Sequence, residues 1–239
     1  MNVLDTPIVG GLVKARIKPT EVYPFWNRYY GGFARPCRDL EAGDLSVRAK
    51  TRLNEALDRC ISRQRPRLLV KITGWCRLGF LDALFSDARF IHVARDWRAV
   101  ANSTMNVHFW RGWLGPANWR WGLLTPELAE EWAHHDRSFV ALAGIQQKIL
   151  LAALEHARTR LKNGALLEIK YEDLCERPME VMSRVCDFCE LDMDPALERA
   201  VKHTTLRNSN HKWREDLTEL QGNILETVLR EPLDRYGYL

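Results

Sequence analysis

Arg95 and Ser103 are the side chains whose types and spacing most clearly suggest a binding site. Arg95 follows the apolar run Phe90–Ala94, and Ser103 lies eight residues later in a segment with a helical pattern. In open parallel sheets, ligands bind beyond the carboxyl ends of the strands. A guanidinium there and a hydroxyl on the next helix can hold a phosphate between them. The alternative is that Arg95 pairs with Asp96 or another carboxylate and that Ser103 is an ordinary helix residue.

A second group of chemically capable side chains lies in residues 106–124, a segment rich in Trp, Gly and Asn. Five of the nine tryptophans fall between residues 110 and 132, and Arg111 and Arg120 lie among them. Aromatic faces stack on sugar rings, bases or apolar molecules, and arginines hold anions. This Trp-rich loop therefore either recognises an acceptor molecule or packs as a cover over the upper edge of a sheet.

Alternating strands and helices would position both groups. Short apolar runs predict strands at 67–72, 90–94 and 165–171, and helical periodicity predicts helices at 45–63, 78–86 and 97–105. Strands that are covered on both faces and alternate with helices imply a parallel sheet. The predicted fold class is therefore α/β, a parallel sheet flanked by helices.

Helices account for most of the chain after the Trp-rich loop. Thr125 and Pro126 are typical of a helix start, and the helical pattern continues to Asn163-Gly164 with a break expected near Gly144. Amphipathic patterns predict further helices at about 178–190, 195–203 and 216–230.

Length and composition favour one globular domain. The 239 residues are 46% hydrophobic and 28% charged and contain no repeat or linker, so we expect a single domain over 1–239 in which 1–45 is irregular. The net charge of +4 is spread along the chain, which suits a small anionic ligand and forms no basic stripe for nucleic acid.

Composition also bears on location. No apolar run approaches the ~20 residues of a membrane helix, and the first residues do not have the pattern of a signal peptide. The six cysteines are scattered, and Cys186 and Cys189 have no partner pair that would complete a metal site. We therefore expect a cytoplasmic, reduced protein without a membrane span.

Three blocks of sequence, in order, carry a resemblance to a known family. They are Asp87–Ser103 (DARFIHVARDWRAVANS), Ile169–Leu174 (IKYEDL) with Pro178 and the helix after it, and His211–Leu217 (HKWREDL). Together they resemble sulfotransferases that use 3′-phosphoadenosine 5′-phosphosulfate (PAPS). The resemblance covers about residues 65–239 and implies a P-loop nucleotide-kinase-like architecture, with PAPS as the cosubstrate and no metal.

The resemblance also implies roles for individual residues. Arg95 and Ser103 match the family's two 3′-phosphate ligands, and Arg207 matches a later phosphate contact. Tyr171 matches the tyrosine beside the adenine, and the acidic pair after it has a structural role near the nucleotide in the family. The implied reaction is transfer of a sulfuryl group to a hydroxyl or amine of a small-molecule or carbohydrate acceptor.

Candidate catalytic residues follow from the same comparison. Lys71 matches the family's lysine near the transferring sulfuryl group, where a cation stabilises developing charge. Thr73 stands where the family has its catalytic histidine, and threonine is a poor general base. His108 at the start of the Trp-rich loop is the substitute candidate, while a surface histidine is the alternative.

One family element has no counterpart. The loop of the form Ser-Gly-Thr-Thr, whose backbone N–H groups cradle the 5′-phosphosulfate, does not occur, and Gly10-Gly11 comes closest. We therefore expect either a truncated start or a chain that has lost this loop. The alternative function is a catalytically inactive sulfotransferase-derived nucleotide-binding or scaffold protein. The oligomeric state is not predicted.

Overall fold

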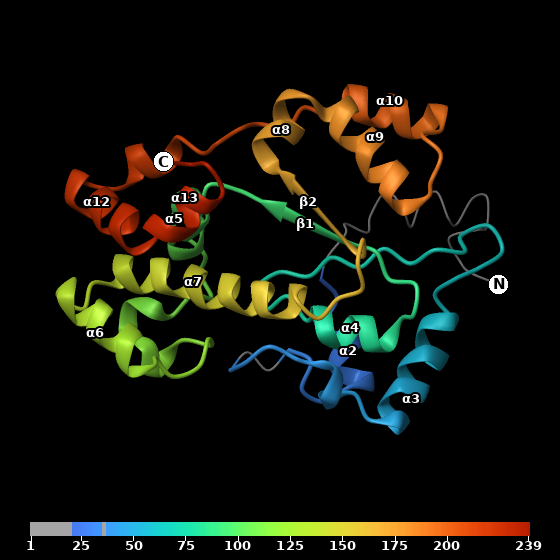
Figure 1. Ribbon diagram of the computed structural model, residues 1–239, viewed down its shortest axis with the longest axis horizontal. Helices are drawn as coiled ribbons and strands as arrows, with labels where there is room; N and C mark the ends of the chain where they lie inside the picture. Colours follow the sequence, from blue (N-terminus) through green and yellow to red (C-terminus); the bar gives the residue numbers. More distant parts are fainter. Residues whose placement is uncertain (1–20, 35–36) are drawn as a thin grey trace. The chain divides into compact units, whose positions relative to one another are not determined.

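The structure, a computed structural model, describes residues 21–34 and 37–239 of the chain (Figure 1). The chain forms two units with separate internal packing, residues 1–86 and residues 87–239. Gly10-Gly11 lies outside the described residues, and the single domain over 1–239 stays a prediction. Among the described residues, no helix has the length and apolar character needed to cross a membrane.

The first unit is helical and packs around aromatic side chains. Its elements are α2 (Tyr23–Tyr29), the 3-10 helix η2 (Ala42–Asp44), α3 (Val47–Asp58) and α4 (Leu78–Leu84). Trp26 of α2 stacks on Phe33 with ring centroids 4.6 Å apart, and Phe33 in turn meets Phe80 of α4 edge-on. The expectation that 1–45 is irregular is therefore wrong for residues 23–29, where burial of Trp26 stabilises a helix that the sequence pattern did not reveal.

The strand predicted at 67–72 is absent. Residues 66–73 have no regular structure, and Leu69 is 92% exposed. An extended segment becomes a strand only when a neighbouring strand takes up its backbone hydrogen bonds. No strand of the described first unit is available to pair with this segment, so its apolar side chains do not produce one.

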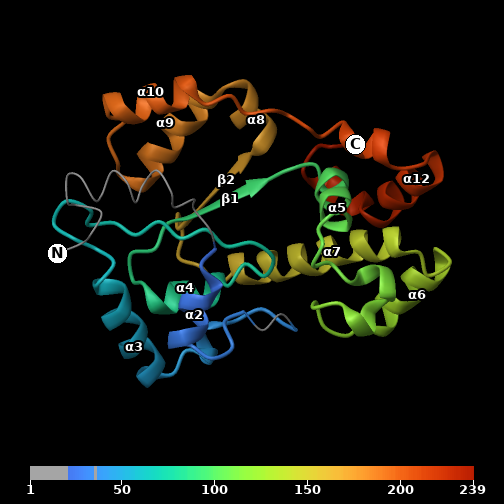
Figure 2. The same cartoon turned by 180° about the vertical axis from the view of Figure 1, so that it is seen from behind.

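The second unit contains the sheet, formed by β1 (Phe90–Ala94) and β2 (Leu166–Lys170). The two strands are parallel, in a register that runs from Phe90 opposite Leu166 to Ala94 opposite Lys170. Both views show them side by side, with α5 (Trp97–Met105) following β1 and α8 (Tyr171–Glu176) following β2 (Figures 1 and 2). The predictions of β1, β2 and α5 are confirmed, and the fold is a helix-rich α/β arrangement with a small parallel sheet.

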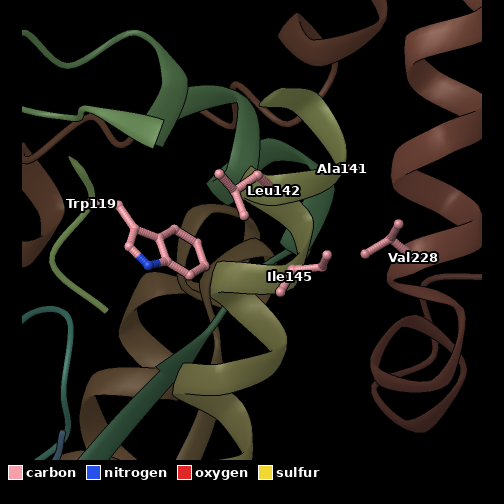
Figure 3. Packing of buried hydrophobic residues seen from close by; sticks show 5 residues of the cluster. All are labelled: Trp119, Ala141, Leu142, Ile145 and Val228. Atoms are coloured by element: carbon pink, nitrogen blue, oxygen red, sulfur yellow. The ribbon is translucent and has the colours of Figure 1, made fainter. Parts of the chain in front are cut away.

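A long helix carries the core of the second unit. The helical pattern after Thr125 gives α6 (Pro126–His134) and α7 (Phe139–Arg158), and the break lies at 135–138 instead of near Gly144. Trp119 of the Trp-rich loop and Val228 of α12 (Glu219–Val228) pack from different sides on Leu142 and Ile145 of α7 (Figure 3). Gly144 lies within α7 because its missing side chain allows α12 to approach: a Cβ there would meet Val228 Cγ1 at 2.9 Å.

The Trp-rich loop is irregular but anchored. It contains two 3-10 turns, η3 (Gly112–Leu114) and η4 (Pro116–Asn118). The buried Trp110 donates its indole N–H to Gln146 of α7 at 2.8 Å, while Trp113 is 57% exposed. The remaining helices are α9 (Pro178–Cys189), α10 (Pro195–His203), α11 (Lys212–Asp216) and α13 (Arg230–Arg235).

Candidate functional site

Arg95 and Tyr171 meet where the two parallel strands end. Each is the first residue after its strand, and the pairing of Ala94 with Lys170 brings them to the same edge of the sheet. The Arg95 guanidinium carbon lies 4.9 Å from the centre of the Tyr171 ring. An aromatic face attracts a cation at this distance. The ring therefore supports the guanidinium while leaving its positive charge intact.

The other partners of Arg95 are neutral. Its Nε donates to Asn210 Oδ1 at 2.7 Å, and its Nη2 lies 3.1 Å from the hydroxyl of Ser209. A guanidinium has five N–H groups, so these two bonds leave donors for a ligand. No carboxylate of the described residues pairs with Arg95. The alternative that Arg95 is neutralised by Asp96 is therefore wrong.

Asp96 is engaged by Arg98 instead. Its carboxylate accepts the backbone N–H of Arg98, which caps the start of α5, and also the Arg98 side chain at 2.9 Å. Arg98 is 5% exposed and also pairs with Glu226. Burial lowers the pKa of Arg98, but its hydrogen bonds to Asp96 and Glu226 more than offset this and leave the pKa above its ordinary value. Arg98 thus fixes the fold around Arg95 and is itself already paired.

Tyr171 also ties the segment around Arg207 to the site. Its hydroxyl donates to the backbone carbonyl of Arg207 at 2.9 Å. Burial raises the pKa of Tyr171, so the phenol stays protonated and able to donate. The Arg207 side chain is exposed. Residues 207–210 therefore pass over the strand ends, with Arg207 beside Tyr171 and Asn210 against Arg95.

Glu172 connects the parts of this cluster. Its Oε1 accepts the backbone N–H of Asp96 at 3.2 Å and the side-chain amide of Asn210, and its Oε2 accepts the hydroxyl of Tyr238 at 2.8 Å. Sequence reasoning missed Ser209, Asn210 and Tyr238 as site residues. The polar run Asn208-Ser209-Asn210 signals a loop, but nothing in the sequence places that loop against Arg95.

Ser103 does not contact Arg95 in this structure. It is exposed on α5, and its hydroxyl has no hydrogen bond to any described residue. A helix rises 1.5 Å per residue, so Ser103 lies roughly 9 Å along α5 from Trp97, the first residue of the helix. The neighbouring Asn102 faces another way and donates to Asp216 at 2.7 Å. The role of Ser103 therefore remains a prediction.

The two candidate catalytic residues lie in different units. In the first unit, Lys71 is largely exposed and pairs with Glu21 at 3.0 Å, and the Thr73 hydroxyl also contacts that carboxylate. In the second unit, His108 is exposed, and its ring lies edge-on to Phe109 with centroids 5.4 Å apart. No described carboxylate or carbonyl accepts a hydrogen bond from the His108 ring. A catalytic histidine is commonly oriented by such a bond to its second ring nitrogen, and His108 lacks one among the described residues.

The cluster at the strand ends fits an anion next to a flat ring. A cation with unused donors lies over Tyr171, and the exposed Arg207 adds a second positive charge at the same loop. Charge-assisted hydrogen bonds from a guanidinium to phosphate are strong and directional. The arrangement can hold a phosphate ester, with an aromatic side chain at hand for a base.

Comparison with known proteins gives one match. The model of the sulfotransferase family matches residues 39–195, roughly two thirds of the chain. This range includes Lys71, Arg95 and Tyr171 and ends before Asn210 and Tyr238. Searches of curated proteins and of solved structures gave no match. The strand ends that form the candidate site thus lie within the matched residues, and the chain belongs to the sulfotransferase family.

Proposed function

We propose that this protein binds the 3′-phosphoadenosine group of PAPS at the Arg95 cluster and transfers the sulfuryl group to an acceptor. The observation that carries the proposal is the state of Arg95, which neutral partners hold over Tyr171 while no described carboxylate cancels its charge. Arg98 shows the contrasting, purely structural case, because it is buried and paired with two carboxylates. An arginine that is fixed yet not neutralised suits an anionic ligand.

The remaining ligand contacts combine this cluster with Ser103, which matches a phosphate ligand of the family. Arg95 takes the 3′-phosphate, with Ser103 and the exposed Arg207 as further contacts. Tyr171 lies beside the adenine. Membership in the family supports sulfuryl transfer in general, and PAPS is the donor class that matches a site for a phosphate ester next to an aromatic ring.

The chemistry is a displacement at sulfur. A hydroxyl or amine of a small-molecule or carbohydrate acceptor forms a bond to sulfur, and the bond between sulfur and the bridging phosphate oxygen breaks. Adenosine 3′,5′-bisphosphate leaves with the electron pair of that bond. Lys71 stabilises the charge that develops on the bridging oxygen, and His108 is the candidate acceptor of the proton. The displacement itself requires no metal.

A second candidate function is nucleotide binding without transfer. It is favoured by one observation: the sequence contains the Arg95 cluster but no Ser-Gly-Thr-Thr loop for the 5′-phosphosulfate. Such a protein would bind adenosine 3′,5′-bisphosphate and PAPS alike and would release no sulfated product.

The test compares two nucleotides that differ only in the 3′-phosphate. The thermal midpoint is measured with adenosine 3′,5′-bisphosphate and with adenosine 5′-monophosphate. A ligand at 100 times its Kd stabilises the folded state by about 2.7 kcal/mol, which raises the midpoint of a domain of this size by roughly 5–10 °C. We expect this rise with the bisphosphate alone, and we expect Arg95→Ala to abolish it.

Arg177→Ala is the matched control, because Arg177 is an exposed arginine already paired with Asp173 and Glu180. It should leave the response to the bisphosphate unchanged. Equal responses to the two nucleotides, or a response that survives Arg95→Ala, would refute the assigned 3′-phosphate site. Incubation of a binding-competent chain with PAPS and a panel of acceptors then separates the enzyme from the inactive binder.

A further inference from the structure

Four side chains form a continuous series of contacts that ends at Arg95. Tyr238, the penultimate residue of the printed sequence, donates its hydroxyl to Glu172 Oε2 at 2.8 Å. The other oxygen of Glu172 accepts the amide N–H of Asn210, and Asn210 Oδ1 accepts Nε of Arg95 at 2.7 Å. The series therefore joins the C-terminal segment to the guanidinium that faces the proposed phosphate.

Glu172 determines which way the Asn210 amide points. An ionised carboxylate only accepts hydrogen bonds, so it must face the NH2 end of the amide. The oxygen end then faces Arg95, whose N–H groups only donate. If the carboxylate were displaced, the amide could turn, and its NH2 group would stand against the guanidinium. The orientation that holds Arg95 thus depends on Glu172.

Tyr238 in turn fixes Glu172. Its backbone carbonyl accepts a hydrogen bond from the buried Arg98 at 2.9 Å, and Lys170 Nζ lies 5.0 Å from the centre of its ring. With its backbone and ring held in this way, the Tyr238 hydroxyl is aimed at Glu172. Burial, followed by the hydrogen bond to Glu172, raises the pKa of Tyr238, so this hydroxyl remains a donor at neutral pH.

We propose that Tyr238 is a positioning residue for the 3′-phosphate site, acting through Glu172 and Asn210 on Arg95. The inference rests on the proposed function, because it concerns how well Arg95 is held for the ligand. Tyr238 touches no ligand atom in this scheme. Its contribution is to keep the Asn210 amide turned so that Arg95 presents its remaining donors in one orientation.

The test uses two tyrosines that lie two residues apart. Tyr238→Phe removes only the hydroxyl that contacts Glu172. Tyr236→Phe is the matched control, since its hydroxyl lies 3.3 Å from Glu168 and 3.5 Å from Glu155 and has no contact with the Arg95 cluster. Both variants lose a hydrogen bond to a carboxylate, so both should melt at a somewhat lower temperature than the wild type.

The deciding quantity is the ratio of the Kd for adenosine 5′-monophosphate to the Kd for adenosine 3′,5′-bisphosphate, measured by calorimetry. This ratio reports the gain from the 3′-phosphate, which a general loss of stability does not change. We expect Tyr238→Phe to lower the ratio about threefold to tenfold. This change corresponds to part of the free energy of one charge-assisted hydrogen bond between Arg95 and the phosphate. Tyr236→Phe should leave the ratio at the wild-type value.

The outcomes separate the inference from the proposed function. A wild-type chain with equal Kd values for the two nucleotides overturns the proposed function and the inference with it. A wild-type chain that prefers the bisphosphate, together with an unchanged ratio in Tyr238→Phe, overturns the inference alone. Should Tyr238→Phe not fold, Glu172→Gln supplies the same comparison, because a glutamine no longer forces the Asn210 amide into one orientation. An unchanged ratio in that variant also overturns the inference.

Discussion

Arg95 directly follows β1, whereas Arg98 lies three residues later in the first turn of α5, and the two arginines have opposite surroundings. Arg98 is buried and pairs with Asp96 and Glu226, whereas Arg95 bonds only to neutral groups and lies over the Tyr171 ring. The two arginines thus differ in function. Arg98 neutralises Asp96 and Glu226, whereas Arg95 keeps its charge, which we propose a ligand neutralises.

Tyr171 offers a test of how the site is built. Tyr171→Phe keeps the ring under Arg95 but removes the hydrogen bond to the Arg207 carbonyl. Tyr171→Leu removes both. We expect a loss of affinity for adenosine 3′,5′-bisphosphate of a few fold in the first variant and of about tenfold to a hundredfold in the second, because the aromatic support for Arg95 and the adenine is lost. Isothermal calorimetry measures both, and equal losses would contradict a role for the ring.

The sequence was sufficient for the parts of the site that depend on local pattern. The apolar run before Arg95 and the helical pattern after it specify β1 and α5, and the run before Tyr171 specifies β2. In a parallel pair the two carboxyl ends come to the same edge. The meeting of Arg95 and Tyr171 therefore follows from elements that the sequence reveals.

The rest depends on partners that are distant in the sequence. Asn210 lies 115 residues from Arg95 and makes its contact only because the loop after α10 crosses the strand ends. The run at 67–72 shows the opposite case, since its β-branched and leucine side chains suggest a strand but the described part of the first unit contains no strand that could pair with it. Neither the contact of Asn210 with Arg95 nor the missing strand at 67–72 can be predicted from neighbouring residues alone. Each depends on the position of a second segment that is distant in the sequence.

Lys71 is the residue to change for catalysis. Lys71→Met removes the cation but keeps the length of the side chain, and we expect the transfer rate to fall by about a hundredfold to a thousandfold, the usual effect of losing one group that stabilises transition-state charge. The Kd for adenosine 3′,5′-bisphosphate should rise as well, because this product keeps the former bridging oxygen and its charge, so the rate is compared with PAPS at saturating concentration. Single-turnover kinetics with PAPS measures the rate.

Glu21→Gln is the control for Lys71. Glu21 is the carboxylate that pairs with Lys71 at 3.0 Å, and the hydrogen bond from Lys71 is the main cause that lowers the pKa of Glu21. Removing its charge frees the lysine, so the transfer rate should be equal to or higher than that of the wild type. A fall in rate as large as that of Lys71→Met would mean that the ion pair, and not the free cation, is the functional element.

Gly144 tests the packing of α7 on α12. In an exposed helix, Gly→Ala stabilises by up to about 1 kcal/mol. Here the added methyl group would lie 2.9 Å from Val228 Cγ1 and 3.4 Å from Leu225 Cδ2, and overpacking costs about 1–3 kcal/mol. We therefore expect Gly144→Ala to lower the free energy of unfolding by about 1 kcal/mol, as measured by denaturant titration.

The double variant Gly144→Ala with Val228→Ala provides the check, because it removes the clash and keeps the added methyl group. It should be more stable than Val228→Ala alone. If Gly144→Ala stabilises the wild-type chain, α12 does not approach α7 as closely as the structure shows, and the helix would have no steric reason for a glycine at this position.

Tyr236 predicts how stability responds to alkaline pH. Burial, followed by the charges of Glu168 and Glu155, raises the pKa of Tyr236, whereas a phenol in the unfolded chain titrates near its ordinary pKa of about 10. Below that pH both states hold the proton, and the stabilising contribution is fully present. Above it the unfolded chain releases a proton that the folded chain keeps, so the free energy of unfolding falls by up to about 1.4 kcal/mol per pH unit for this group.

Denaturant titrations at pH 9, 10 and 11 should give a shallower decline in the free energy of unfolding for Tyr236→Phe than for the wild type. The lysines, the cysteines and the remaining tyrosines titrate in both proteins, so the difference in slope isolates the Tyr236 phenol. Parallel declines would show that Tyr236 ionises in the folded chain as readily as in the unfolded one.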